Sequence, residues 1–164
     1  MKTYIGTKIV KMEPMTRVEY NVFRGWQLPS DENGADEGYL VEYTDGGKPN
    51  VTGREGYVSW SPKEQAENAY REVHGLTFGL ALEALKKGLK VARSGWNGKG
   101  LFIFLVPGSQ FKVSRAPLNT IYPEGTPIDY RPHIDIKNVD GTISTWSPSI
   151  GDTLSEDWQI VEGV

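Results

Sequence analysis

Apolar and polar residues alternate in many short stretches of this chain, which predicts a protein built mainly from β-strands. Most of these stretches are bounded by Gly, Pro, Asn or Asp, the residues typical of turns. The run Leu101–Val106 is apolar at every position and is typical of a central strand. The predicted strands cover residues 2–11, 39–43, 56–60, 89–93, 101–106, 110–113, 128–130, 133–137, 142–146 and 158–161.

Three helices are predicted, over residues 16–23, 61–73 and 77–88. Each begins with a hydroxyl residue that can cap a helix N-terminus, and the last ends at a glycine. In the first helix, a glutamate three residues after the cap completes a capping box. The predicted N-caps are Thr16, Ser61 and Thr77.

The restart of a capped helix directly after His74–Leu76 predicts a module boundary there. We therefore expect an α+β protein with two modules. Residues 1–73 form a smaller α+β module of unknown role. Residues 76–164 form a small antiparallel β-sheet domain with one main helix.

Composition narrows the function classes. A hydrophobic content of 38% over 164 residues is enough for a buried core, and no run is long enough to span a membrane. The net charge of −3 argues against binding of nucleic acid polymers, which relies on a surplus of Lys and Arg. The absence of cysteine excludes thiolate catalysis and Cys-ligated zinc. The acidic surplus lies before Gly75, so an anion site is expected after it.

Catalytic patterns have little support. There is no P-loop, GxGxxG, GxSxG or HExxH motif. His133 and Asp135 share one face of a predicted strand, but a structural pair is favoured over a zinc site, which needs three or four ligands. Asp152 and Asp157, with Glu156 between them, are more often surface charges than an acid–base pair. We therefore predict no enzyme activity, no metal and no cofactor.

Aromatic residues beside basic ones are a stronger signal. Trp96 lies in the turn Arg93–Lys99 and Trp146 ends the predicted strand 142–146, so the two rings could sandwich a planar base while Arg93 or Lys99 meets phosphate. Core packing is the alternative for both tryptophans. Arg115 and Arg131 lie in loops that could border the same pocket, or they are solvated surface charges.

Consecutive motifs carry a resemblance. Residues 76–161 are similar, in order and spacing, to the second family of Thoeris anti-defence proteins of phages. The matching motifs are FGLALEALKKG at 78–88, VARSGWNGKG at 91–100, FLVPG at 104–108, YRPHID at 130–135, DGT at 140–142, Trp146 and Asp157–Trp158. Residues 1–73 resemble a phage extension to which no activity can be assigned.

The resemblance implies a protein that sequesters a cyclic nucleotide immune signal in the host cytoplasm. The signal would be glycocyclic ADP-ribose, and in some cases a cyclic dinucleotide, held uncleaved so that a Thoeris-type or CBASS-type effector stays off. Trp96 and Trp146 match the family's base-stacking tryptophans, and pockets are shared between protomers of a homotetramer. The expected ligand-binding residues are Arg93, Trp96, Asn97, Lys99, Arg115, Arg131, Trp146, Ser147 and Asp152.

Three other function classes stay open at this point. A hydrolase of ADP-ribose or of cyclic nucleotides would alter the ligand chemically. A phage structural or assembly protein would purify with particles, and only the unexplained first module suggests it. A single-strand nucleic acid binder would also use stacking and basic groups, but with steep salt dependence.

Overall fold

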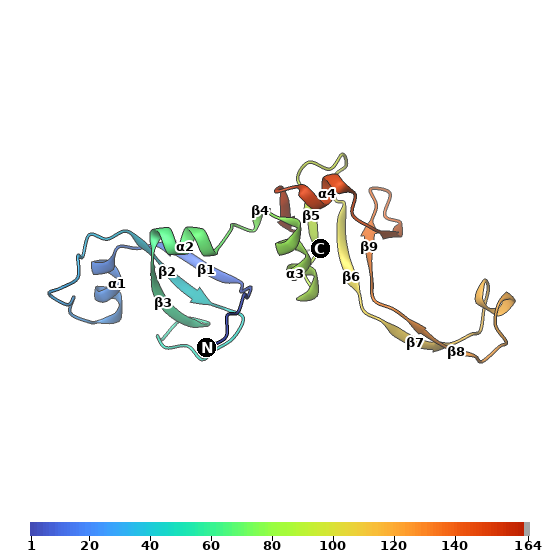
Figure 1. The fold of residues 1–164 in the computed structure, drawn as a ribbon, viewed down its shortest axis with the longest axis horizontal. Coiled ribbons are helices and arrows are strands. Elements are labelled where there is room, and N and C mark those ends of the chain that lie inside the picture. The colour runs from blue at the N-terminus through green and yellow to red at the C-terminus, as the bar shows by residue number, and fades with distance from the viewer. Residues whose placement is uncertain (163–164) are drawn as a thin grey trace. The chain divides into compact units, whose positions relative to one another are not determined.

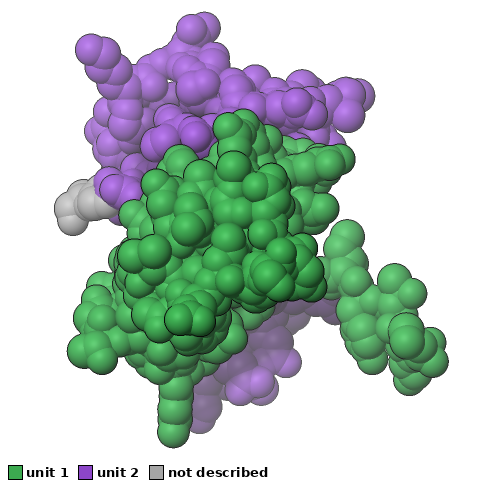
Figure 2. All heavy atoms as spheres, turned by 90° about the vertical axis from the view of Figure 1, so that its left-hand side faces the viewer, with its two compact units in different colours: residues 1–71 green, residues 72–164 purple. Residues whose placement is uncertain are grey.

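The computed structural model describes residues 1–162, and the chain divides into two compact units, Met1–Arg71 and Glu72–Val164. Figure 2 colours the two units separately. Each unit has its own sheet and its own hydrophobic cluster. Both combine antiparallel strands with short helices, so the predicted α+β class is confirmed.

Unit 1 is a three-stranded antiparallel sheet in the order β1-β2-β3, with two helices (Figure 1). Its core joins Tyr20 of the first helix to Leu40 and Val58 of the sheet, and all three are buried. The elements are β1 (Val10–Pro14), α1 (Arg17–Arg24), β2 (Gly38–Tyr43), β3 (Tyr57–Pro62) and α2 (Lys63–Ala69).

Local sequence signals explain how α1 begins and ends. The predicted capping box is confirmed: the Thr16 hydroxyl accepts from the Glu19 amide, and the Glu19 carboxylate accepts from the Thr16 amide at 2.7 Å. At the other end Gly25 is left-handed, with φ of 69°, and its N–H bonds back to the last turn. Helix α1 is therefore fixed by short-range hydrogen bonds at both ends.

Two predictions for unit 1 are wrong in their boundaries. The first strand begins at Val10, not at Lys2. Ser61 does not cap α2, because Ser61 and Pro62 still belong to β3, where they pair with Tyr39 and Gly38. Helix α2 also stops at Ala69 instead of continuing to residue 73. Cross-strand pairing thus overrides a good local capping signal.

Unit 2 is built around a six-stranded antiparallel sheet in the order β10-β9-β6-β5-β11-β4. The apolar strand predicted to be central, now β6, lies between β9 and β5. The sheet strands and helices are β4 (His74–Leu76), α3 (Phe78–Lys86), β5 (Val91–Arg93), β6 (Phe102–Val106), β9 (His133–Lys137), β10 (Ile143–Trp146), α4 (Ile150–Leu154) and β11 (Trp158–Ile160).

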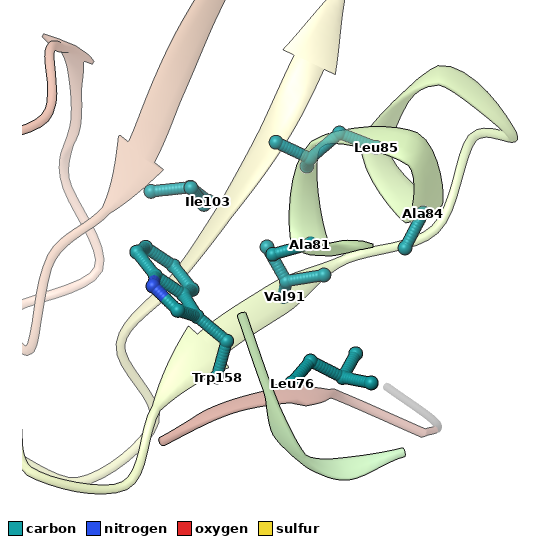
Figure 3. Close-up of a cluster of buried hydrophobic side chains, with 7 residues drawn as sticks. All are labelled: Leu76, Ala81, Ala84, Leu85, Val91, Ile103 and Trp158. Atoms are coloured by element: carbon teal, nitrogen blue, oxygen red, sulfur yellow. The ribbon is translucent and has the colours of Figure 1, made fainter. Parts of the chain in front are cut away.

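Helix α3 packs on one face of this sheet and forms the main core with it (Figure 3). Trp158 of β11 is fully buried, and Figure 3 shows its ring beside Ile103 and Val91. Leu85 and Ala81 of α3 close the same cluster. The predicted cap Thr77 accepts from the Leu80 amide, so α3 begins where the sequence indicates.

A long hairpin extends the β6–β9 pair into a projecting arm, which we call the β7–β8 arm (residues 107–132; Figure 1). Its strands are β7 (Ser109–Lys112) and β8 (Pro127–Tyr130), joined by a loop with the short helix η1 (Leu118–Thr120). Val113 is buried inside the arm. Most of the other arm side chains are exposed.

Besides the short helix η1, two elements of unit 2 were not predicted. Residues 74–76, where the sequence places the module boundary, form the edge strand β4 and pair with β11. Helix α4 has a capping box between Ser149 and Asp152. The Ser-x-x-Asp spacing of that box was a readable signal, but a five-residue helix has too few positions to show a period.

Candidate functional site

The turn between β5 and β6 carries Trp96 and is held in shape by two glycines. Gly98 and Gly100 have φ of 141° and 75°, values that L side chains rarely adopt. A Cβ atom on Gly98 would lie 2.6 Å from Val139 Cγ2 in the neighbouring hairpin turn. The turn therefore fits tightly against the β9–β10 hairpin.

A cluster of one arginine and two aspartates, which we call the Arg93 network, fixes the start of this turn. The Arg93 guanidinium donates from Nε and Nη2 to both carboxylate oxygens of Asp157, at 2.7 and 3.3 Å, and from Nη1 to Asp152 Oδ1 at 2.8 Å. Asp157 Oδ2 also accepts from the Gly95 amide at 2.9 Å. Three chain segments are joined at this point.

Asp152 is the most heavily hydrogen-bonded carboxylate of the site. Besides Arg93, it accepts from the indole N–H of Trp96 at 3.1 Å and from the amide and hydroxyl of Ser149. Its backbone carbonyl accepts from the indole N–H of Trp158 at 3.0 Å. One residue thus completes the capping box of helix α4 and bonds to the indole N–H groups of two tryptophans.

Both aspartates are held in the ionised form. Burial raises the pKa of Asp152, but the hydrogen bonds from Arg93, Ser149 and Trp96 together outweigh it and place that pKa well below its usual range. Hydrogen bonding from Arg93 likewise lowers the pKa of Asp157. Neither carboxyl is suited to act as a general acid near neutral pH, because that role needs a raised pKa.

Four aromatic rings lie in mutual contact beside the Arg93 network, and we call them the aromatic cluster: Phe78, Trp96, Trp146 and Trp158. Trp158 is fully buried, whereas Trp96 and Trp146 are only partly buried. The predicted pair is therefore brought together, and each of its rings keeps some exposure to solvent.

The angle between the two predicted stacking rings is important. The Trp96 and Trp146 centroids are 6.1 Å apart and their planes are inclined at 63°, an edge-to-face contact. A flat base needs two nearly parallel rings with room between them. Within one copy of the chain, the two rings touch and leave no such slot.

The other predicted site residues are divided between two places. Asn97 and Lys99 are exposed in the Trp96 turn, and Ser147 is exposed directly after Trp146. Arg115 and Arg131 are exposed on the β7–β8 arm, which precedes His133, the first residue of β9. Within one copy of the chain, Arg115 and Arg131 therefore lie on the β7–β8 arm and not in the Trp96 turn.

Sequence reasoning left out Asp157, Ser149 and Phe78. Asp157 had been considered only as a possible acid, although its position directly before the buried Trp158 was visible in the sequence. Its pairing with Arg93 depends on the contact between β5 and β11, which no local pattern specifies. Phe78 belongs to the motif at 78–88 but was not assigned to the site.

Unit 1 has a hollow of about 330 Å³ between the start of α1 and the start of α2. All of its lining residues belong to unit 1, whereas the tryptophan pair belongs to unit 2. Its polar groups already bond to neighbours: Lys63 to Glu37, and Thr16 to Glu19. The Tyr39 hydroxyl donates to Glu67. We give the aromatic cluster more weight as a site, because Trp96 and Trp146 are only partly buried, whereas these polar groups of the hollow already have hydrogen-bond partners.

Within residues 1–162, no helix is long and apolar enough to cross a membrane. The same residues contain no group of three or more His, Asp or Glu side chains placed to hold a metal ion.

Comparison with known proteins gives one consistent result for unit 2. A family model described as Tad2-like, the Thoeris anti-defense 2-like domain, matches residues 76–161. A curated relative named Thoeris anti-defense 2, from Bacillus phage SP01, is 43% identical over 86 residues. The match covers 52% of this chain and 94% of that relative. The resemblance inferred from the sequence motifs is confirmed.

Proposed function

We propose that this chain, which belongs to the Thoeris anti-defense 2-like family and has a phage anti-defence role, sequesters a cyclic nucleotide immune signal. The ligand class is glycocyclic ADP-ribose, with cyclic dinucleotides as a second class. The signal is held without cleavage in the cytoplasm of the infected bacterium, so that the host effector is not activated.

The observation that carries this proposal is the fixed, partly exposed Trp96 ring. Its N–H is anchored on Asp152, and its ring packs against Trp158 with centroids 5.4 Å apart. A ring held in this way loses little conformational freedom when a base stacks on it. Tight binding without turnover needs such preorganisation and needs no nucleophile.

The inclined pair of rings supports a pocket shared between copies of the chain. Because Trp96 and Trp146 cannot enclose a base within one copy, the second wall of the slot has to come from another element. We assign that wall to a neighbouring protomer of a homotetramer. The arm residues Arg115 and Arg131, which lie away from the turn of their own copy, would then meet the ligand of a neighbour.

The Arg93 network changes the proposed role of one residue. Arg93 already donates to two carboxylates, so its charge is compensated within the chain. We propose that Arg93 positions the turn and that Lys99 meets the phosphate, with Asn97 and Ser147 as polar contacts at the rim. Asp152 orients Trp96 instead of contacting phosphate, which its negative charge would repel.

Isothermal titration of glycocyclic ADP-ribose into the full-length protein tests the site. Replacing Trp96 or Trp146 by Ala should weaken binding by about 5- to 150-fold, because one stacking contact contributes about 1–3 kcal/mol. Trp26→Ala is the matched control, since Trp26 is an exposed tryptophan of unit 1 outside the family match. Unchanged affinity in the Trp96→Ala and Trp146→Ala variants would exclude this site.

Recovery of the ligand tests sequestration against hydrolysis. The complex is heated to unfold the protein, and the released small molecule is analysed by chromatography and mass spectrometry. Sequestration predicts an intact signal with its original mass. An opened or hydrolysed product would show that the protein is an enzyme.

A further inference from the structure

The hollow of unit 1, which we call the unit 1 hollow, lies outside the family match. Its walls come from four separate segments: the end of β1, the start of α1, the start of β2 and the first residue of α2. Its volume of about 330 Å³ is at the lower end of the range for small-molecule pockets, about 300–1,000 Å³. A hollow of this size can take a small ligand or one long side chain.

Backbone hydrogen bonds hold the walls of the hollow together. The Met15 amide donates to the Gly38 carbonyl at 2.9 Å, and the Lys63 amide donates to the Glu37 carbonyl at 3.1 Å. The Trp60 indole N–H donates to the Met15 carbonyl at 2.8 Å. A Cβ atom on Gly38 would lie 2.5 Å from the Trp60 ring, so this ring packs closely against the strand. The hollow is therefore formed by the fold itself.

Part of the lining is apolar. Pro14, Met15 and the ring of Tyr39 supply this surface, and Met15 and Tyr39 are partly buried. The Tyr39 hydroxyl donates to Glu67 at 2.8 Å, which restrains the ring. Apolar surface favours a ligand with a hydrocarbon part, and the face of an aromatic ring attracts cations.

The charged lining of the hollow is acidic on balance, with two glutamates and one lysine. The Lys63 ammonium donates to Glu37 Oε2 at 2.7 Å, so these two charges compensate each other. The Glu19 carboxylate accepts only from the N–H and hydroxyl of Thr16, both at Oε2, and meets no cation within residues 1–162. No hydrogen bond from the described residues reaches Oε1 of either glutamate. A carboxylate can accept at both oxygens, so acceptor capacity is left over.

Both glutamates of the lining are held in the ionised form. Hydrogen bonding from Thr16 lowers the pKa of Glu19, and hydrogen bonding from Lys63 lowers the pKa of Glu37. An anionic ligand would therefore be repelled. A metal ion fits poorly, because the part of the chain that the structure describes holds no group of three acidic or histidine side chains placed for one. An organic cation suits this lining best.

We propose that the unit 1 hollow binds a primary ammonium group carried on an apolar chain. An ammonium group has three donors and no acceptor, so it can bond to Glu19 and Glu37 together. The methylene groups of its chain then pack on Met15 and Tyr39. A free alkyl diamine and the lysine side chain of a partner protein both offer this chemistry. The site is independent of the proposed signal capture, since it lies outside the matched residues.

Amide NMR spectra of the full-length protein, recorded during titration, test the site. The probes are the diamine cadaverine, for a free amine, and Nα-acetyl-lysine methylamide, for a lysine side chain. Both should shift the amide signals of Thr16, Glu19 and Gly38 and reach saturation, whereas pentanol and pentanoate should not. The probe that binds more tightly identifies the source of the ammonium group. No saturable shift with either cation, or an equal response to pentanol, would overturn the proposal.

Glu19→Gln removes the charge and keeps the helix cap, because glutamine also fits this position of a capping box. Its dissociation constant for cadaverine should rise by about fivefold, the upper end for an exposed ion pair. Glu64→Gln is the matched control, since Glu64 is an exposed glutamate of α2 that does not line the hollow. An equal effect in the two variants would show that the cation responds only to overall charge and would overturn the site.

Lys63→Gln should have the opposite effect. It removes the competing cation and frees Glu37, so cadaverine should bind severalfold more tightly than to wild type. A variant that fails to fold would lose binding instead, and weaker binding by folded Lys63→Gln would contradict the proposal. Trp96→Ala, which tests the signal site, should leave cadaverine binding unchanged. Failure of either proposal is therefore distinguishable from failure of the other.

Discussion

At the scale of single residues, Asp152 connects the local sequence to the proposed site. The Asp152 carboxylate belongs to the capping box of a short helix, and it also accepts hydrogen bonds from Arg93 and Trp96. Its charge is compensated and its position is fixed by groups from three segments. The geometry of Trp96 therefore depends on an atom that belongs to α4.

Replacing Asp152 by Asn should lower the free energy of unfolding of unit 2 by about 2–4 kcal/mol, because the charge that faces Arg93 is lost and an NH2 group replaces one of the two acceptor oxygens. Urea titration followed by tryptophan fluorescence measures the change. Asp140→Asn is the control, since Asp140 is an exposed residue of the β9–β10 turn. An equal effect in both variants would contradict the role given to Asp152.

The lowered pKa values of Asp152 and Asp157 predict acid sensitivity. A carboxyl whose pKa is lower in the folded state stabilises the fold fully above its unfolded-state pKa, which is about 3.9 for Asp. That stabilisation is lost as the pH falls from there toward the folded-state value. At pH values below about 4, the urea concentration at the unfolding midpoint of wild type should therefore decrease. The difference in that midpoint between wild type and Asp152→Asn should also become smaller.

The candidate site could be predicted only in part from the sequence. Trp96 and Trp146 were identified because tryptophans among small and basic residues are conspicuous, and the structure places their rings in contact. The pairing of Arg93 with Asp157 could not be foreseen, since it joins residues 64 positions apart. The charge of an arginine is visible in a sequence, whereas the charges that compensate it are not.

At the scale of elements, predictions succeeded where a local signal and the tertiary structure agree. Helices α1 and α3 begin at the predicted caps, and each helix also packs buried side chains against the sheet of its unit. The predicted start of α2 failed because Ser61 and Pro62 are held in β3 by pairing with β2. Strand β4 was missed because three residues carry no readable period.

The Trp96 turn is the element in which backbone conformation limits substitution most. Gly98→Ala should cost about 1–3 kcal/mol, since an L residue is strained at this φ and its Cβ would overlap with Val139. The free energy of unfolding measures the cost, and ligand titration should show weaker binding. Gly79→Ala in α3 meets no close neighbour and should leave stability unchanged or raise it by up to about 1 kcal/mol.

At the scale of the whole molecule, two hydrophobic clusters without shared members predict two separable unfolding events. Leu40 of unit 1 and Leu85 of unit 2 are both fully covered and provide a matched pair. Each Leu→Ala substitution should destabilise its own unit by about 2–5 kcal/mol. Differential scanning calorimetry of the full-length protein should show Leu40→Ala moving one transition and Leu85→Ala moving the other.

A single transition that shifts equally in both variants would show that the two units unfold together. Separate transitions would agree with the family match, which covers unit 2 and leaves unit 1 outside. Unit 1 would then be free to carry a role of its own, independent of the anti-defence domain.

The contact among Trp96, Trp146 and Trp158 also has an optical consequence. Indole rings 5.4–6.1 Å apart and steeply inclined couple their electronic transitions, which gives paired bands of opposite sign in the circular dichroism spectrum. A base that stacks on Trp96 would join this coupled system and change the shape of the bands. The protein thus contains its own label-free reporter, with which the capture of a signal could be followed in real time.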